Sequence, residues 1–233
     1  MRRLSFLTPF IIVATIWTVF RSSLFTIDTV SIVAHPDIFS DLSLLTRKNN
    51  LIFISIQNLS RELLKNPYIQ SVKITKQFPS TLTISINERT PVAYLSQENS
   101  TRYVDHEGYI FNYLPRFSQL NLPQIYCESV IETSRIEHKG LVLALSVVAQ
   151  LQASPLEVRT ISCIDEKSVQ FEINGVEVVI DDQTDATNLS SSLLFLFKQF
   201  RIEGKQPKKV DMRFEKPVLI PDFEEKESSA TAF

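Results

Sequence analysis

The sequence predicts an α+β protein in three parts: an apolar N-terminal segment, a small β-α-α-β-β unit and a larger β-rich α+β domain. Three observations support this prediction. The segment at residues 4–20 is the longest apolar run in the chain. Several short runs alternate apolar and polar residues, which is the period of half-buried strands. Other stretches repeat apolar residues at the spacing of an amphipathic helix.

The apolar segment 4–20 is predicted to be an uncleaved transmembrane helix at the short end of spanning lengths. A cleaved signal peptide is the alternative, since Arg2 and Arg3 would also suit its basic start. The apolar run is longer than a typical signal-peptide core, and no small-x-small cleavage site follows it. The basic N-terminal flank predicts residues 1–3 as a cytoplasmic stub and the bulk of the chain outside the cytoplasm.

The composition argues against several functional classes. The chain has 233 residues and a net charge of −2, which does not suggest a nucleic-acid-binding surface. It has 4 Gly and neither a G-x-G-x-x-G nor a G-K-[ST] motif, so neither a phosphate-binding loop nor a cofactor is predicted. Cys127 and Cys163 are predicted to be buried free thiols, and pairing in an oxidising compartment is the alternative.

Residues 25–65 are predicted to supply one strand and two helices. The strand covers residues 25–33, and a short helix begins at Asp37 or Ser40 and ends near residue 46. Ser55 is expected to cap the second helix. Its apolar residues share one face: Ile56, Leu59, Leu63 and Leu64.

The most regular pattern covers residues 66–93 and predicts a β-hairpin. Pro67 ends the helix before it. Two alternating runs follow, and residues 78–80 separate them. The second run places its apolar residues on one face: Leu82, Ile84 and Ile86.

The motifs of this stretch resemble the FtsQ/DivIB family of bacterial division proteins. The POTRA (polypeptide-transport-associated) domain of that family carries Pro-aromatic-aliphatic, Pro-x-Thr-Leu-x-Ile and Glu-Arg-x-Pro-x-Ala. This chain has Pro67-Tyr68-Ile69, Pro79-Ser80-Thr81-Leu82-Thr83-Ile84 and Glu88-Arg89-Thr90-Pro91-Val92-Ala93. The resemblance implies a POTRA domain at residues 25–91.

Two later motifs extend the resemblance. Residues 103–111 are similar to the family's Val-Asp-x-x-Gly-x-Val-Phe hairpin, and residues 209–214 to its C-terminal Val-Asp-x-Arg-aromatic signature. The resemblance implies a C-terminal β domain at residues 92–221. Residues 222–233 are acidic and rich in small residues, which predicts a disordered tail.

The pattern of this second domain predicts its main elements. Residues 141–151 are strongly apolar but too short to span a membrane, so they form a core helix. Strands follow at 156–164, 169–173 and 176–180. Asn174-Gly175 between the last two is a strong hairpin signal. A final helix is expected over residues 186–200.

A cluster of carboxylates is the strongest candidate for an enzyme or metal site. Asp181, Asp182 and Asp185 could hold a hard cation. They also lie between a predicted strand and a predicted helix. Carboxylates at the N-terminus of a helix cap its backbone amides. We therefore predict capping, with no catalytic or metal site and no enzyme activity. A membrane-tethered hydrolase that uses these carboxylates is the alternative in the enzyme class.

Partner binding is predicted at the C-terminal strand, within residues 214–223. A sheet edge offers unpaired N–H and C=O groups to an incoming strand. An ordinary closing strand with a paired edge is the alternative. The predicted partner-binding residues are Phe214, Glu215, Val218, Leu219 and Ile220.

The resemblance implies a single-pass type II protein of the cell (inner) membrane, at the division septum and mostly periplasmic or extracytoplasmic. It further implies a scaffold of the divisome that recruits FtsB/DivIC and FtsL-type partners and is linked to septal peptidoglycan synthesis. We expect no nucleic acid and no small-molecule substrate. A POTRA-type protein that handles polypeptides in secretion or outer-membrane assembly is the alternative.

Overall fold

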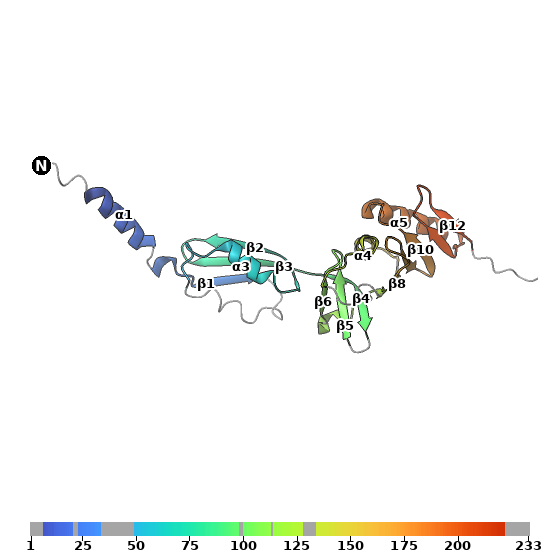
Figure 1. The fold of residues 1–233 in the computed structure, drawn as a ribbon, viewed down its shortest axis with the longest axis horizontal. Coiled ribbons are helices and arrows are strands. Elements are labelled where there is room, and N and C mark those ends of the chain that lie inside the picture. Colours follow the sequence, from blue (N-terminus) through green and yellow to red (C-terminus); the bar gives the residue numbers. More distant parts are fainter. Residues whose placement is uncertain are drawn as a thin grey trace, which may run out of the picture. The chain divides into compact units, whose positions relative to one another are not determined.

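The computed structural model describes residues 7–20, 23–33, 49–97, 100–112, 114–127 and 134–221. The chain divides into two compact units, unit 1 (Met1–Arg89) and unit 2 (Thr90–Phe233), and Figure 1 labels most of their elements. Each unit has its own apolar core. The two cores confirm an α+β protein with a small sheet-based unit followed by a larger one.

Unit 1 contains a three-stranded sheet in the order β1-β3-β2 (Figure 1). The strand β1 is parallel to β3, and β2 is antiparallel to it. The strands β2 and β3 form the predicted hairpin, and Leu82 and Ile84 of β3 are fully buried at 0% exposure. The described elements of this unit are the helices α1 (Leu7–Phe20) and α3 (Ile56–Leu63), the 3-10 turn η1 (Ser23–Phe25), β1 (Thr29–Val33), β2 (Ile69–Gln77) and β3 (Thr81–Glu88).

The helix α3 (Ile56–Leu63) begins as predicted, because the Ser55 hydroxyl accepts a hydrogen bond from the Asn58 N–H. Its predicted apolar face is only partly right. Leu63 is 4% exposed, but Ile56 and Leu64 are 37% and 45% exposed. Leu64 follows Leu63 by about 100° around the helix, which directs it away from the buried face. Ile56 lies on the same face as Leu63 but at the first residue of the helix, where it is more exposed.

The helix α1 (Leu7–Phe20) lies within the predicted membrane segment. Among the helices of the described ranges, none combines the length and apolar character needed to cross a membrane. The transmembrane helix at 4–20 therefore stays a prediction. The stub at 1–3, the short helix expected before residue 46 and the tail at 222–233 lie outside the described residues.

Unit 2 is built on a nine-stranded sheet in the order β12-β11-β10-β9-β8-β7-β4-β5-β6. The pairs β4/β7, β7/β8 and β10/β11 are parallel, and the other neighbours are antiparallel. The strands are β4 (Pro91–Gln97), β5 (Ser100–Asp105), β6 (Ile110–Asn112), β7 (Gln124–Tyr126), β8 (Val158–Cys163), β9 (Val169–Ile173), β10 (Val176–Ile180), β11 (Lys209–Asp211) and β12 (Val218–Ile220).

Two turns of this sheet form as the sequence predicts. Asn174 and Gly175 adopt φ angles of 50° and 84°, which the β9–β10 hairpin requires. In the β5–β6 turn, the Asp105 carboxylate accepts hydrogen bonds from the Glu107 and Tyr109 N–H groups at 3.0 and 2.8 Å. Gly108 supplies the positive φ of 82° in that turn.

Among the described residues of unit 2, the helices α4 (Lys139–Leu151) and α5 (Ala186–Glu203) accompany the sheet (Figure 1). The helix α4 packs against β4, β8, β9 and α5. Because α4 buries residues spaced three and four apart, it confirms the predicted core helix. The helix α5 continues beyond the predicted end at residue 200 and stops at Gly204, which adopts a φ of 65°. A short 3-10 turn, η3 (Pro115–Phe117), precedes β7.

The prediction of free thiols is wrong, because Cys127 and Cys163 form a disulfide. Cys163 ends β8, and Cys127 directly follows β7. The parallel register pairs Tyr126 with Ser162, so the next residue of each strand lies opposite the other. Their Cα atoms are 5.3 Å apart. The two cysteines are separated by 36 positions in sequence, so local sequence patterns do not reveal that they are neighbours.

Candidate functional site

The candidate site is the β12 edge of unit 2. This strand stands last in the sheet order and pairs with β11 alone among the described strands. The register places Lys209 opposite Ile220, Val210 opposite Leu219, and Asp211 opposite Val218. One long side of β12 is thus paired, and the other faces no described strand.

The ladder determines which backbone groups of β12 point outward. The Lys208 N–H donates to the Ile220 carbonyl at 2.9 Å, so the backbone of Ile220 faces β11. In antiparallel pairing, hydrogen-bonded and non-hydrogen-bonded positions alternate. The N–H and C=O of Leu219 therefore point away from β11, toward the unpaired side.

The β11 strand gives the same result independently. The Met212 N–H donates to the Val179 carbonyl of β10 at 2.8 Å, so Met212 faces β10. The preceding residue, Asp211, then faces β12, where its partner is Val218. Val218 and Ile220 both face β11, which leaves Leu219 as the residue of β12 whose backbone is directed outward.

Side chains on both faces of β12 are open to solvent. Val218, Leu219 and Ile220 are 46%, 47% and 43% exposed. Successive side chains of a strand point to opposite faces of its sheet. An added strand could therefore make apolar contacts on both faces of this edge.

The structure brings three of the five predicted partner-binding residues together in β12: Val218, Leu219 and Ile220. Phe214 and Glu215 lie in the connection between β11 and β12 rather than in the strand. Both are exposed, and the Phe214 side chain is 60% exposed. Those two residues flank the edge and do not contribute to its ladder.

An ion pair fixes the chain just before these residues. Arg213 Nη2 lies 2.6 Å from Asp211 Oδ2, and Arg213 Nε donates to Asp211 Oδ1 at 2.9 Å. The Asp211 carboxylate also accepts from the Arg213 backbone N–H at 3.1 Å. The side-chain hydrogen bond from Arg213 lowers the pKa of Asp211 below its usual value and raises the pKa of Arg213. Sequence reasoning noted this pair only as part of a motif.

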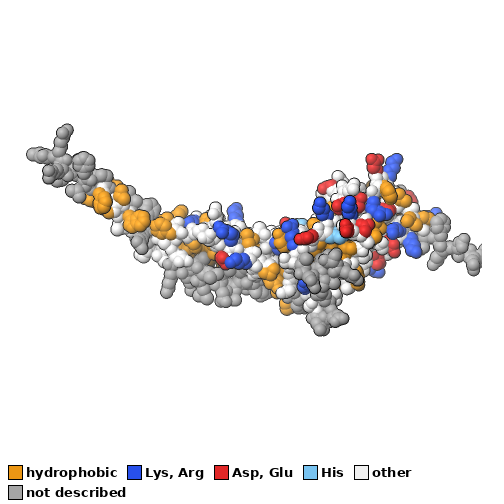
Figure 2. Space-filling view, viewed as in Figure 1, with side chains coloured by type: hydrophobic (Ala, Val, Ile, Leu, Met, Phe, Trp, Pro, Cys, Tyr) orange, Lys and Arg blue, Asp and Glu red, His pale blue; other side chains and the backbone are white. Residues whose placement is uncertain are grey.

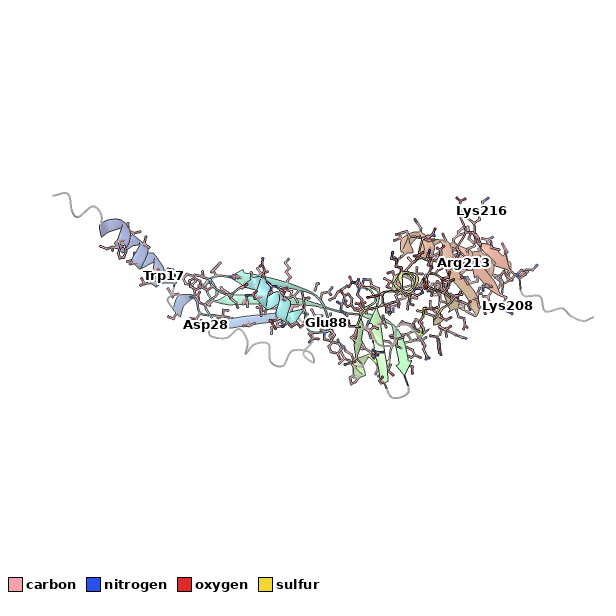
Figure 3. The ribbon with its side chains drawn as sticks, in the orientation of Figure 1. Trp17, Asp28, Glu88, Lys208, Arg213 and Lys216 are labelled. Atoms are coloured by element: carbon pink, nitrogen blue, oxygen red, sulfur yellow. A yellow bond between two sulfur atoms is a disulfide. The ribbon has the colours of Figure 1, made fainter. Side chains whose placement is uncertain are left out.

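Among the described residues around the edge, the charged side chains are mainly basic. Lys208, Arg213 and Lys216 are labelled around β11 and β12 in Figure 3, and all three are exposed. Glu215 supplies one opposing charge in the same connection. Figure 2 shows acidic and basic side chains mixed over the visible part of unit 2. The basic character is thus local to the β11–β12 region.

Of the carboxylates at 181–185, Asp185 caps a helix. Asp185 Oδ2 accepts hydrogen bonds from the Thr187 and Asn188 N–H groups at 3.0 and 3.1 Å, at the start of α5. Asp181 Oδ1 accepts from the Gln183 N–H at 3.1 Å. The capping prediction is confirmed for Asp185. Over the residues that the structure describes, no three His, Cys, Asp or Glu side chains are grouped to hold a metal ion.

Comparison with known families defines the class of protein. A family model described as "POTRA domain, FtsQ-type" matches residues 20–89. A second, described as "Cell division protein FtsQ/DivIB, C-terminal", matches residues 93–213. The two units therefore carry the two domains of a bacterial cell division protein. The chain belongs to the FtsQ/DivIB family.

Individual relatives agree with this assignment. A Clostridium tetani protein named cell division protein DivIB is 19% identical over 189 residues, which cover 76% of this chain and 71% of the relative. A Syntrophotalea carbinolica protein named cell division protein FtsQ is 28% identical over 138 residues, 59% of this chain and 45% of the relative. The C-terminal family match ends at residue 213, so β12 follows the matched region.

Proposed function

We propose that this chain is a non-enzymatic, bitopic membrane scaffold of the bacterial divisome. In this proposal it recruits FtsB/DivIC and FtsL-type partners to the septum and is linked to septal peptidoglycan synthesis. Membership of a cell division family supports the divisome role. We place the stub at 1–3, the anchor at 4–20, the POTRA domain at 25–91, the C-terminal β domain at 92–221 and the tail at 222–233.

The observation that carries the proposal is the open edge of β12. A partner segment would add a strand there, with main-chain hydrogen bonds supplying affinity. Leu219 offers the outward N–H and C=O of the strand. The residues two positions to either side, Pro217 and Pro221, have no N–H. The edge is thus short and poor in donors, which limits non-specific pairing and favours a partner in one register.

Side chains would supply selectivity. Val218 and Ile220 lie on one face of β12 and Leu219 on the other, so the added strand should be apolar on both faces. The exposed amines of Lys208 and Lys216 favour acidic residues at its ends. Because these charges are exposed, salt should weaken the attraction.

Two observations support an extracytoplasmic unit 2 on a membrane anchor. Three of the described side chains of α1 are strongly exposed, with Phe10 at 75%, Val13 at 63% and Trp17 at 59%. Apolar side chains without protein neighbours suit a lipid environment. The Cys127–Cys163 disulfide belongs in an oxidising compartment, because cytosolic thiols are kept reduced.

Truncation tests the proposed edge. A chain that ends after Phe214 lacks β12, and it should no longer capture FtsB/DivIC in a pull-down. A chain that ends after Pro221 keeps β12 and loses only residues 222–233, so it should bind like the full chain. Circular dichroism and thermal unfolding show whether both are folded. Equal capture by the folded shorter chain would place the interface elsewhere.

A further inference from the structure

The disulfide of unit 2 lies at the edge of the apolar core, where it borders a hollow. The hollow has a volume of about 540 Å³ and is lined by both cysteines. Cys127 is 7% exposed, whereas Cys163 is only half-buried. The other lining residues are Tyr126, His138, Ile164, Asp165 and Glu166. A reagent that enters the hollow therefore reaches Cys163 more easily than Cys127.

The chain around Cys163 is also held by contacts that do not depend on the disulfide. His138 caps α4, because its Nδ1 accepts a hydrogen bond from the Leu141 N–H at 3.1 Å. Its Nε2 donates to the Asp165 carbonyl at 2.7 Å, which ties the start of α4 to the segment after β8. These bonds would remain if the two sulfur atoms separated.

Further contacts fix the corner formed by the start of α4 and the β8–β9 turn. The Asp165 carboxylate accepts from the Lys167 and Ser168 N–H groups at 2.8 and 2.7 Å. Gly140 packs so closely that an added Cβ would collide with the Lys167 carbonyl oxygen. The start of α4 and the β8–β9 turn are thus joined by hydrogen bonds and close packing. We expect this corner to keep its shape without the covalent bond.

The disulfide joins β8 to β7, the strand whose other neighbour, β4, shares only one registered pair with it. The β4–β7 ladder has one registered pair, Tyr94 with Gln124, whereas β7 and β8 share three. The β7 strand connects the β4–β6 part of the sheet to the part that carries β12. The redox state of the cysteine pair therefore determines whether this connecting strand is covalently fixed to β8.

We propose that Cys127–Cys163 is a thiol–disulfide exchange site that reacts while unit 2 stays folded, with a dithiol as its co-reactant. One thiolate of the dithiol attacks Cys163 Sγ, a new S–S bond forms there, and Cys127 leaves as the thiolate. The second thiol of the reagent then displaces Cys163. The reagent is oxidised to a disulfide, and the protein disulfide is reduced to two thiols. Two electrons and two protons pass from the reagent to the protein.

Native-state reduction kinetics test the proposal. The purified full chain is incubated with dithiothreitol without denaturant, and its free thiols are alkylated and counted by mass spectrometry. Thiols should appear at a rate that rises in proportion to the dithiothreitol concentration and is unchanged by added urea below the unfolding transition, with the circular dichroism spectrum preserved. A rate that does not depend on the reagent would show that the disulfide is reduced only after unit 2 unfolds. Loss of structure as thiols appear would also contradict exchange in the folded unit.

A pair of single substitutions tests which sulfur is attacked. Cys127→Ser leaves Cys163 free, and Cys163→Ser leaves Cys127 free. With oxidised glutathione, the Cys163 thiol should form its mixed disulfide at least about tenfold faster, and guanidinium should abolish the difference. Equal rates in the folded variants would contradict the predicted direction of attack. If either variant fails to fold, the reduction kinetics of the unmodified chain decide.

Discussion

Val210 and Leu219 face each other across the β11–β12 ladder, yet Val210 is 0% exposed and Leu219 is 47% exposed. Directly paired residues project from the same face of a sheet. The apolar layer of unit 2 thus covers Val210 and ends before Leu219. An added strand would extend this layer by one position and cover Leu219.

The core of unit 1 gives a first prediction. Leu82→Ala or Ile84→Ala should lower the free energy of unfolding of unit 1 by about 2–5 kcal/mol, because both side chains are fully buried. Val33→Ala is the control, since Val33 is 61% exposed and should cost at most about 0.5 kcal/mol. Chemical denaturation of residues 24–233 measures all three. Unchanged midpoints for both core variants would refute the assignment of that face.

The cap of α5 gives a second prediction. Asp185→Ala removes the acceptor for two backbone N–H groups and should destabilise unit 2 by about 1 kcal/mol. Asp185→Asn keeps a capping oxygen and should recover most of this loss. Thermal unfolding measures both, with and without a chelator. A chelator effect on the unmodified chain, absent in both variants, would indicate a bound cation instead of a cap.

The Asp211–Arg213 pair gives a pH prediction. The folded-state pKa of Asp211 is lowered, mainly by its side-chain hydrogen bond with Arg213. Its contribution to stability is therefore complete above the ordinary carboxyl pKa and is lost as the pH falls below about 4. Asp211→Asn should cost about 1 kcal/mol at pH 7, because Arg213 is partly exposed. The stability difference between the two proteins should shrink below pH 4, and a constant difference would contradict the assignment.

The apolar segment gives a fourth prediction. Deletion of residues 4–20 should move the chain from the membrane to the soluble fraction, because it removes the apolar segment that is proposed as the anchor. Intact-mass measurement of the membrane fraction should find a chain that begins at Met1 or Arg2. A chain that begins after Ser22 or Ser23 would show that the segment is a cleaved signal peptide.

Features encoded by neighbouring residues could be predicted from the sequence. Asn174-Gly175 specifies its turn through positive φ angles, and Ser55 and Asp185 cap helices that begin at the next residue. The alternation of apolar and polar residues around Leu82 and Ile84 correctly predicted the buried face of β3. Each of these signals acts over a few residues, so it can be interpreted without the tertiary fold.

Features that depend on strand order could not be predicted in this way. The Cys127–Cys163 bond requires β7 and β8 to be parallel neighbours, although α4 stands between them in sequence. The outward direction of the Leu219 N–H depends on the hydrogen-bond phase of β11, which pairs with β10 across α5. The sequence therefore indicated the candidate strand, and only the fold showed which of its residues could accept a partner.

Partner binding by Leu219→Pro and Leu219→Ala tests the central claim most directly. Proline removes the outward N–H, whereas alanine keeps it and trims only the side chain. Immobilised FtsB/DivIC should lose binding to the proline variant by at least about tenfold and retain most binding to the alanine variant, with both variants folded by circular dichroism. If the folded proline variant binds as well as the unmodified chain, the partner does not add a strand at β12.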